Sequence, residues 1–149
     1  MKISISNMLE ITLPKLNQTY EIETIKAEVA YKENTITIKK PIVFPIGSYI
    51  KISNARYNNG IFEVIGEEIE GYKLDKELMP GDETAVITPL NIPKGLLGII
   101  KEMCVAADAM MGNSIKSITE GDTTVTYNEN ELFKSFSAAL SSYKKLKTI

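Results

Sequence analysis

Short apolar–polar runs, separated by turn residues at intervals of roughly ten positions, extend from Tyr20 to Thr88. Such alternation puts every second side chain of a strand on one face, so several short strands can enclose one core. Asn58-Asn59-Gly60 predicts a tight hairpin turn, because Asn and Gly tolerate the positive φ that such a connection demands. We therefore predict that residues 21–92 form an antiparallel β module, either a small barrel or a curled sheet. The predicted strands are 36–38, 42–44, 47–52, 61–65, 71–74 and 84–88.

A strongly apolar helix is predicted directly after the β module. Pro93 suits the first turn of a helix, and Gly112-Asn113-Ser114 suits a helix end. Between them, residues 94–111 carry apolar side chains over about 240° of the circumference, whereas a surface helix needs a stripe of only about 100°. The helix is therefore expected to pack on its own chain with one face and on another chain, or another element of a larger assembly, with the second.

A second helix is predicted near the end of the chain. Asn128 followed by Glu131 is a capping-box arrangement, and apolar residues recur at helical spacing from Leu132 to Tyr143. The segment between the two helices includes Thr124-Val125-Thr126-Tyr127, which has strong β propensity. This segment is predicted either to pair with the β module or to add a strand to a neighbouring protein.

The first 20 residues are ambiguous, because their apolar residues mix alternation with helical spacing. Ser6 or Asn7 is a candidate helix cap, and Pro14 would kink or end the helix. The predicted fold is α+β: a small antiparallel β-barrel-like module followed by two C-terminal helices joined by a loop or strand. The predicted parts are an arm or short helix over 1–20, the β module over 21–92, and a helical region over 93–149 with helices at 93–111 and 129–146.

The chain has no histidine and a single cysteine, Cys104, among its 149 residues. This composition excludes Ser–His and Cys–His nucleophile pairs, His-ligated zinc and an intrachain disulfide. Cys104 lies in the apolar helix and is expected to be buried and unreactive. We expect a non-enzymatic protein that carries no cofactor and no metal.

Charge and hydropathy limit the partners and the location of the chain. The net charge of −2 gives no general attraction to nucleic acid or to an anionic membrane. No apolar run is long enough to span a bilayer, and the N-terminus lacks the apolar segment of a signal peptide. We therefore expect a protein made in the cytoplasm that has no membrane partner.

Acidic residues are concentrated between positions 63 and 83, where eight of them accompany only Lys73 and Lys76. A glycosidase-type site needs two carboxyl groups at a fixed distance in a cleft, which proximity in hairpin loops does not supply. We interpret the run as a solvated rim of hairpin loops or a contact to a basic partner. A carboxylate-based hydrolase is the weakest alternative.

A nucleic-acid-binding barrel is a further alternative, with aromatic residues stacking on bases beside Lys51 and Arg56. However, Tyr49 and Phe62 lie in alternating apolar runs, which favours packing in the core. Residues 1–92 also carry ten basic and thirteen acidic residues. Nucleic-acid binding through Tyr49, Tyr57 and Phe62 is therefore disfavoured.

Two groups of motifs occur in a recognisable order. The first comprises 47–53, 58–64 and Ile92-Pro93-Lys94-Gly95-Leu96, and the second comprises 116–127 with a closing helix that carries Tyr143-Lys144. Over about residues 45–147 the chain resembles the head–tail connector (adaptor) proteins of tailed bacteriophages of Gram-positive hosts. In that family a Ser-Glu element precedes a Gly-Asp/Tyr-x-Ser/Thr-Val-x-Tyr strand. Here Ser117 is kept, the acid stands at Glu120, and Lys144 takes the place of the usual Arg.

The resemblance implies a structural virion protein. Such connectors form rings, usually of twelve subunits, beneath the portal protein and join it to the tail-completion or neck protein. DNA passes through the lumen without specific binding, and the virion is assembled in the cytoplasm of the host bacterium. Family members of known architecture are largely helical, so the β module over 20–88 is an addition to the family pattern.

For a ring, the contacts to other subunits and partners are expected in the apolar helix and in the segment that follows it. A non-catalytic β-module adaptor that binds one protein partner is the alternative function. The predicted contact residues are Ile100, Ala107, Met111, Ile118, Thr124, Val125 and Tyr127.

Overall fold

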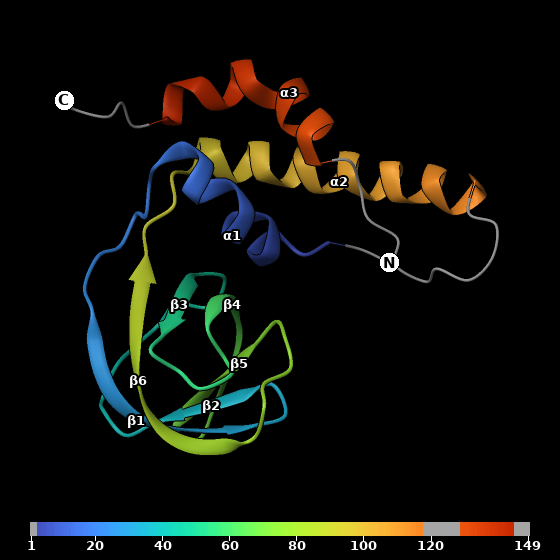
Figure 1. Cartoon of the computed structure of the whole chain (residues 1–149). Helices are drawn as coiled ribbons and strands as arrows, with labels where there is room; N and C mark the ends of the chain where they lie inside the picture. The colour runs from blue at the N-terminus through green and yellow to red at the C-terminus, as the bar shows by residue number, and fades with distance from the viewer. Residues whose placement is uncertain (1–2, 118–128, 145–149) are drawn as a thin grey trace. The chain divides into compact units, whose positions relative to one another are not determined.

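The computed structural model describes residues 3–117 and 129–144, with side chains given for 3–110 and 129–144. The chain divides into two compact units, one formed by residues 19–92 and the other by 1–18 together with 93–149. The first unit is a closed β-barrel and the second is helical (Figure 1). The predicted α+β class, with an antiparallel barrel followed by helices, is therefore confirmed.

Six antiparallel strands close the barrel in the order β1-β2-β5-β4-β3-β6. Every neighbouring pair is antiparallel, including β1 with β6, so the sheet has no open side. A register shift between Val64 and Gly66 bends β4, so that its first half pairs with β3 and its second half with β5. The strands are β1 (Ile25–Lys32), β2 (Thr35–Ile38), β3 (Tyr49–Ser53), β4 (Gly60–Glu68), β5 (Gly71–Leu74) and β6 (Gly81–Leu90).

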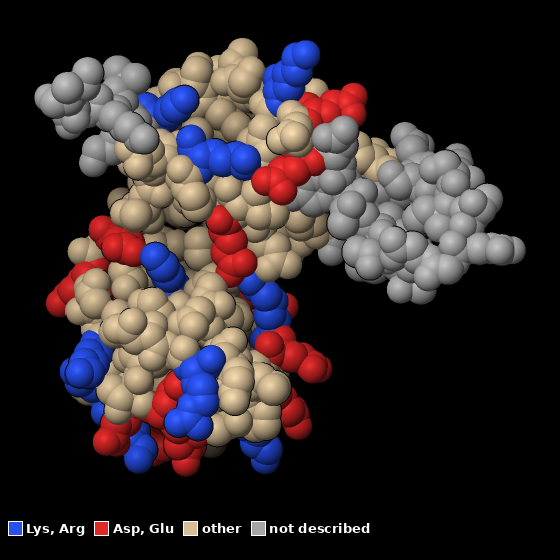
Figure 2. Space-filling view, viewed as in Figure 1, with Lys and Arg blue, Asp and Glu red and all other residues tan. Residues whose placement is uncertain are grey.

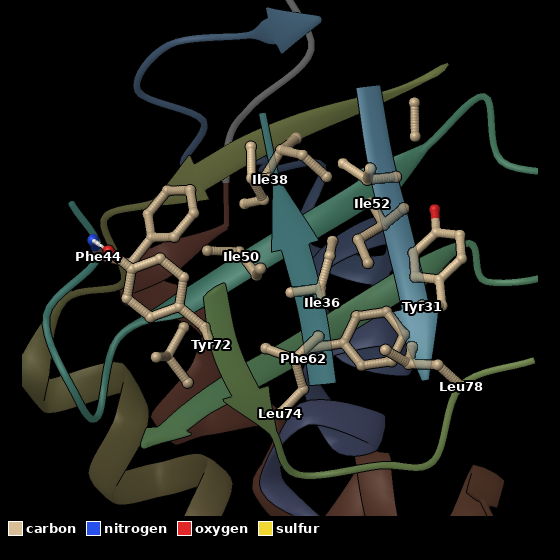
Figure 3. Packing of buried hydrophobic residues seen from close by; sticks show 14 of the residues in the cluster. Tyr31, Ile36, Ile38, Phe44, Ile50, Ile52, Phe62, Tyr72, Leu74 and Leu78 are labelled. Carbon is tan, nitrogen blue, oxygen red and sulfur yellow. Dashed lines mark hydrogen bonds between the residues drawn. The ribbon is translucent and has the colours of Figure 1, made fainter. Parts of the chain in front are cut away.

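Alternating side chains from all six strands fill the barrel (Figure 3). Ile36, Ile50 and Ile87 are fully buried in this core. The segment 42–44 was predicted to be a strand, but it is a loop whose Phe44 ring packs on Tyr72 with 5.2 Å between centroids. The Tyr72 hydroxyl accepts a hydrogen bond from the Phe44 amide (3.0 Å) and donates one to the Ile42 carbonyl (2.8 Å). These side-chain bonds satisfy the loop backbone in place of a strand partner.

The predicted tight turn at Asn58-Asn59-Gly60 is also wrong. β3 and β4 are joined by six residues, 54–59, and Gly60 already belongs to β4. The two asparagines act through their side chains: Asn59 exchanges hydrogen bonds with the Ala55 backbone, and Asn58 does so with Met79. Both are Asn–backbone bonds that stabilise a longer loop rather than a two-residue turn.

Among its described residues, 3–18, 93–117 and 129–144, the helical unit contains three α-helices. α1 (Ile5–Leu16) is a regular helix, which settles the ambiguity of the first 20 residues. Its N-cap is Ser4 rather than Ser6 or Asn7, since the Ser4 hydroxyl accepts a hydrogen bond from the Asn7 amide. Pro14 lies in the last turn, and Asn17 ends the helix in the left-handed conformation.

The two later helices differ from their predicted bounds. α2 runs over Lys94–Ser117, so the predicted end at residue 111 is wrong and Gly112 continues the helix. A helix-interior glycine costs only about 1 kcal/mol, which neighbouring turns can outweigh. α3 runs over Glu129–Leu140 and is followed by a single 3-10 turn at Ser141–Tyr143, instead of continuing as an α-helix to residue 146. Both α1 and α3 pack on α2 (Figure 1).

Candidate functional site

The apolar surface of α2 is the first candidate for an interaction site. Its residues at positions 96, 100, 103 and 107 share one face at helical spacing and are fully buried. Two of them, Ile100 and Ala107, were predicted to contact another chain, yet they already lie in the core of the single chain. The second apolar face is used within the helical unit, because α1 and α3 both pack on α2. Among the side chains of α2 that the structure describes, Val105 is the large apolar one that is exposed, at 71%.

The other predicted contact residues lie outside the side chains that the structure describes. Met111 belongs to α2, but its side chain is outside the described residues. Ile118, Thr124, Val125 and Tyr127 lie in 118–128, which is also outside them. The strand predicted around Val125 therefore stays a prediction.

The residues that precede α1 are hydrogen-bonded to side chains of α2. The Ile3 amide donates a hydrogen bond to the Asp108 carboxylate (2.9 Å), and the Cys104 thiol contacts the Ser4 carbonyl at 3.7 Å. Cys104 is buried, as predicted. Burial, and secondarily the negative charge of Asp108, raises the pKa of the Cys104 thiol to about 11.

The raised pKa predicts that Cys104 reacts slowly with thiol reagents in the native protein. At pH 8 only about one thiol in a thousand is ionised at such a pKa, compared with roughly a quarter for an unperturbed cysteine. We expect alkylation by iodoacetamide to be at least a hundredfold slower than for free cysteine, and to become fast in guanidinium chloride. Mass spectrometry over time measures both rates, and equal rates in the two conditions would contradict the buried position.

The C-terminal end of α1 contacts α3 and the 3-10 turn. Lys15 forms an ion pair with Glu129 (3.5 Å), and its ammonium lies 4.7 Å from the centre of the Phe133 ring. The Gln18 side-chain amide donates to the Tyr143 carbonyl (3.1 Å). These contacts join segments more than 100 residues apart in the sequence, so the N-terminal helix is an integral part of the helical unit.

The acidic residues between positions 63 and 83 are mostly exposed, which agrees with their interpretation as a solvated rim of hairpin loops. Glu68 pairs with Lys73 at 3.2 Å, and the Asp75 carboxylate accepts a hydrogen bond from the Glu63 amide at 2.9 Å. Acidic and basic side chains are interspersed over the visible face of the barrel (Figure 2). The rim therefore carries carboxylates with local structural partners as well as exposed ones.

Within residues 19–92, all of which the structure describes, the aromatic side chains do not form the stacking surface that a nucleic-acid-binding barrel needs. Tyr49 and Phe62 are buried, as their positions in apolar runs predicted. Tyr57 is 68% exposed, and Lys51 is paired with Glu21 at 3.2 Å. A single exposed ring gives no series of platforms for successive bases.

Two of the hollows on the barrel differ most in size and lining. The larger, about 640 Å³, is an open groove between residues 37–43 and the β4–β5 hairpin, with lysines on one side and glutamates on the other. The smaller, about 50 Å³, lies where the end of β1, the 54–59 loop and residues 79–83 meet. Sequence reasoning missed the smaller hollow, because its residues come from three separate segments.

Comparison with known proteins does not assign the chain to a family. No family model, curated protein or solved structure matches it. In the part of the chain that the structure describes, no three His, Cys, Asp or Glu side chains gather as metal ligands. No helix among the same residues is long and apolar enough to cross a membrane.

Proposed function

We propose that this protein is a structural, non-catalytic subunit of a head–tail connector ring in a tailed bacteriophage. The observation that carries the proposal is the Ser117 to Tyr127 signature, with Tyr143-Lys144 after it, in a chain whose helices flank that signature. The signature connects α2 to α3, the two helices that the resemblance requires around it.

The division of the chain into units supports the proposal. Known connectors of this type are largely helical, and a β module over 20–88 departs from that pattern. Residues 19–92 form a separate barrel inserted between α1 and α2, and the remainder is a helical unit. An insertion at the surface of a domain leaves the parent fold intact when its ends lie in a connecting segment. The barrel is thus an addition to a helical connector subunit.

A closed ring needs two different patches on each subunit, because its interfaces are heterologous. The residues proposed for these contacts are Val105, which is exposed on α2, and five of the predicted contact residues, whose side chains lie outside the described part of the structure. These five are Met111, Ile118, Thr124, Val125 and Tyr127. An extended segment can add a strand to a neighbour through main-chain hydrogen bonds.

The proposed partners follow from this assignment. The subunit contacts copies of itself in a ring of about twelve, as the resemblance implies, together with the portal protein above and the tail-completion or neck protein below. DNA passes through the lumen without specific contacts, which suits a net charge of −2. The location is the virion, assembled in the cytoplasm of the bacterial host.

Electron microscopy of the virions that contain this protein tests the proposal. A gold-labelled or enlarged version of the chain should add density as a ring between the portal and the tail. Density in the capsid shell or the tail fibres would overturn it. Light scattering supplies an independent test: a stable one-to-one complex with a single partner, and no ring, would favour the adaptor alternative.

A further inference from the structure

The open groove of the barrel has two walls of opposite charge. One wall is formed by residues 37–43 and the other by the β4–β5 hairpin, and the volume between them is about 640 Å³. We call them the lysine wall and the glutamate wall, because opposite charges on separate walls allow each to attract the other wall of a matching surface. The charged side chains that line them are Lys39 and Lys40 on the first, and Glu67, Glu68 and Glu70 on the second.

Part of this charge is not used within the chain. Lys39 and Glu68 form ion pairs with neighbours on the barrel surface, at 3.6 and 3.2 Å. The exposed side chains of Lys40, Glu67 and Glu70 form no ion pair with any residue that the structure describes. These three can therefore pair with charges on another chain without breaking an ion pair of their own.

Each wall also carries an exposed apolar side chain. Val43 is 81% exposed on the lysine wall, and Ile69 is 93% exposed in the turn of the β4–β5 hairpin. Ile46 and Ile65, from the same loop and the same hairpin, are exposed as well. Single exposed apolar residues are normal, but these two segments hold four of the eight large apolar side chains that are exposed among the described residues. This concentration indicates an interaction surface.

Both walls are fixed before anything binds. The Tyr72 hydroxyl is hydrogen-bonded to the backbone of the residues before and after Val43, and the rings of Tyr72 and Phe44 lie side by side (Figure 3). On the other wall, the Ile38 amide donates to the Glu70 carbonyl (3.3 Å), which joins the hairpin turn to the end of β2. Such fixed walls lower the ordering cost of association.

The groove is complementary to itself. A partner must offer carboxylates to the lysine wall and ammonium groups to the glutamate wall, together with apolar side chains. A second copy of the chain offers this set when a twofold axis runs along the groove, because the rotation places the lysine wall of each copy opposite the glutamate wall of the other. A twofold axis across the groove would instead place lysines against lysines.

We propose that two copies of this chain associate through this groove, in a twofold-symmetric contact between their barrels. Lys40 and Glu70 both lie at the end of the groove next to Ile38, because Ile38 is two residues before Lys40 and its amide donates to the Glu70 carbonyl. Lys40 of each copy therefore faces Glu70 of the other. Val43 packs on the glutamate wall of the second copy, and Ile69 packs on its lysine wall. The contact uses the barrel alone, so it does not rest on the proposed ring.

Sedimentation and native mass spectrometry of the full chain test this contact. We expect a dimer whose population rises with protein concentration and falls with salt. Lys40→Glu and Glu70→Lys should each weaken dimerisation by at least about tenfold, since each places like charges together at two symmetry-related points. Lys32→Glu makes the same charge change as Lys40→Glu at an exposed lysine outside the groove, and it should have little effect.

A mixture of the two groove variants distinguishes this contact from the binding of a different protein. In a heterodimer of Lys40→Glu with Glu70→Lys, both symmetry-related points again carry opposite charges. Mixing should therefore restore association as heterodimers, and the double variant in one chain should restore it as homodimers. Both positions are exposed, so the variants keep the barrel folded. Failure of both the mixture and the double variant to associate would overturn the proposed pairing.

Val43→Ser tests the apolar part of the contact. It should weaken dimerisation by about tenfold, because the substitution acts twice in a symmetric dimer. Val105→Asp, on the helical unit, should leave the dimer intact. A chain that stays monomeric up to about 0.5 mM would overturn the proposal, as would a dimer that Lys40→Glu and Val43→Ser leave unchanged. A ring that assembles normally with both variants and contains no such dimer would overturn it and leave the connector function standing, whereas dimers without rings would do the reverse.

Discussion

Replacement of Ile100 by aspartate is expected to lower the free energy of unfolding of the helical unit by at least about 4 kcal/mol. Ile100 is fully buried, so the substitution leaves a cavity and places a carboxylate where no water reaches it. Burial of an unpaired charge adds to the cost of the lost apolar contacts. The loss of amide protection along α2, measured by hydrogen exchange, reports this effect directly.

Val105→Asp is the matched control for this substitution. It introduces the same charge into the same helix, at a side chain that is 71% exposed, and should change stability by no more than about 0.5 kcal/mol. Ile100→Val adds a milder variant that keeps the fold and should cost about 1 kcal/mol. Normal α2 protection in Ile100→Asp would contradict the buried position of Ile100. A ring that assembles normally with Val105→Asp would exclude Val105 from the proposed subunit contact.

The barrel was the more predictable half of the fold. Alternation marks β2, β3 and the first half of β4, because their core residues, such as Ile36 and Ile50, are large and regularly spaced. β1 is harder to recognise: its inward residues are Ala27, Val29 and Tyr31, and small Ala27 gives a weak apolar signal between charged neighbours. The missed strand also carries Tyr31, so the hollow that it lines was missed with it.

The predicted turn at Asn58-Asn59-Gly60 was wrong for a physical reason. Asn58-Asn59-Gly60 has the composition of a tight turn, but the same side chains can bond to backbone groups at a distance. Asn58 bonds with Met79, 21 positions away, and local propensity carries no information on such a partner. The small hollow was unpredictable for this reason, since tertiary pairing brings its three segments together.

The excess apolar surface of α2 was recognised from the sequence, but its use was not. A wide apolar arc shows that two surfaces must cover the helix, and it does not distinguish a second chain from a second element of the same chain. α1, from the start of the sequence, and α3 provide that cover. Because 74 residues, positions 19–92, separate α1 from α2 in the sequence, no local sequence pattern indicates that these two helices are in contact.

Gly71→Ala is expected to destabilise the barrel by about 2–4 kcal/mol, although it adds a single methyl group. A Cβ at this position would overlap the carbonyl oxygen of Ile36 and crowd the backbone of Thr37. β2 and β5 pair over only three residue pairs, of which Thr37 with Gly71 is one. The overlapping atoms belong to the backbone of β2, so the clash can be removed only if β2 moves away from β5. The closed barrel then opens between these two strands.

Hydrogen exchange at single amides locates this opening. The Ile38 amide, bonded to the Glu70 carbonyl at 3.3 Å, and the Leu74 amide, bonded to the Asn34 carbonyl at 2.8 Å, should lose protection in Gly71→Ala. Gly98→Ala is the matched control, because a Cβ there meets no atom within 4 Å and Gly98 lies on the exposed side of α2. That substitution should stabilise the helical unit by about 0.5–1 kcal/mol, since alanine is the better helix former. Unchanged hydrogen exchange at Ile38 and Leu74 in Gly71→Ala would contradict the close approach of the β2 backbone to Gly71.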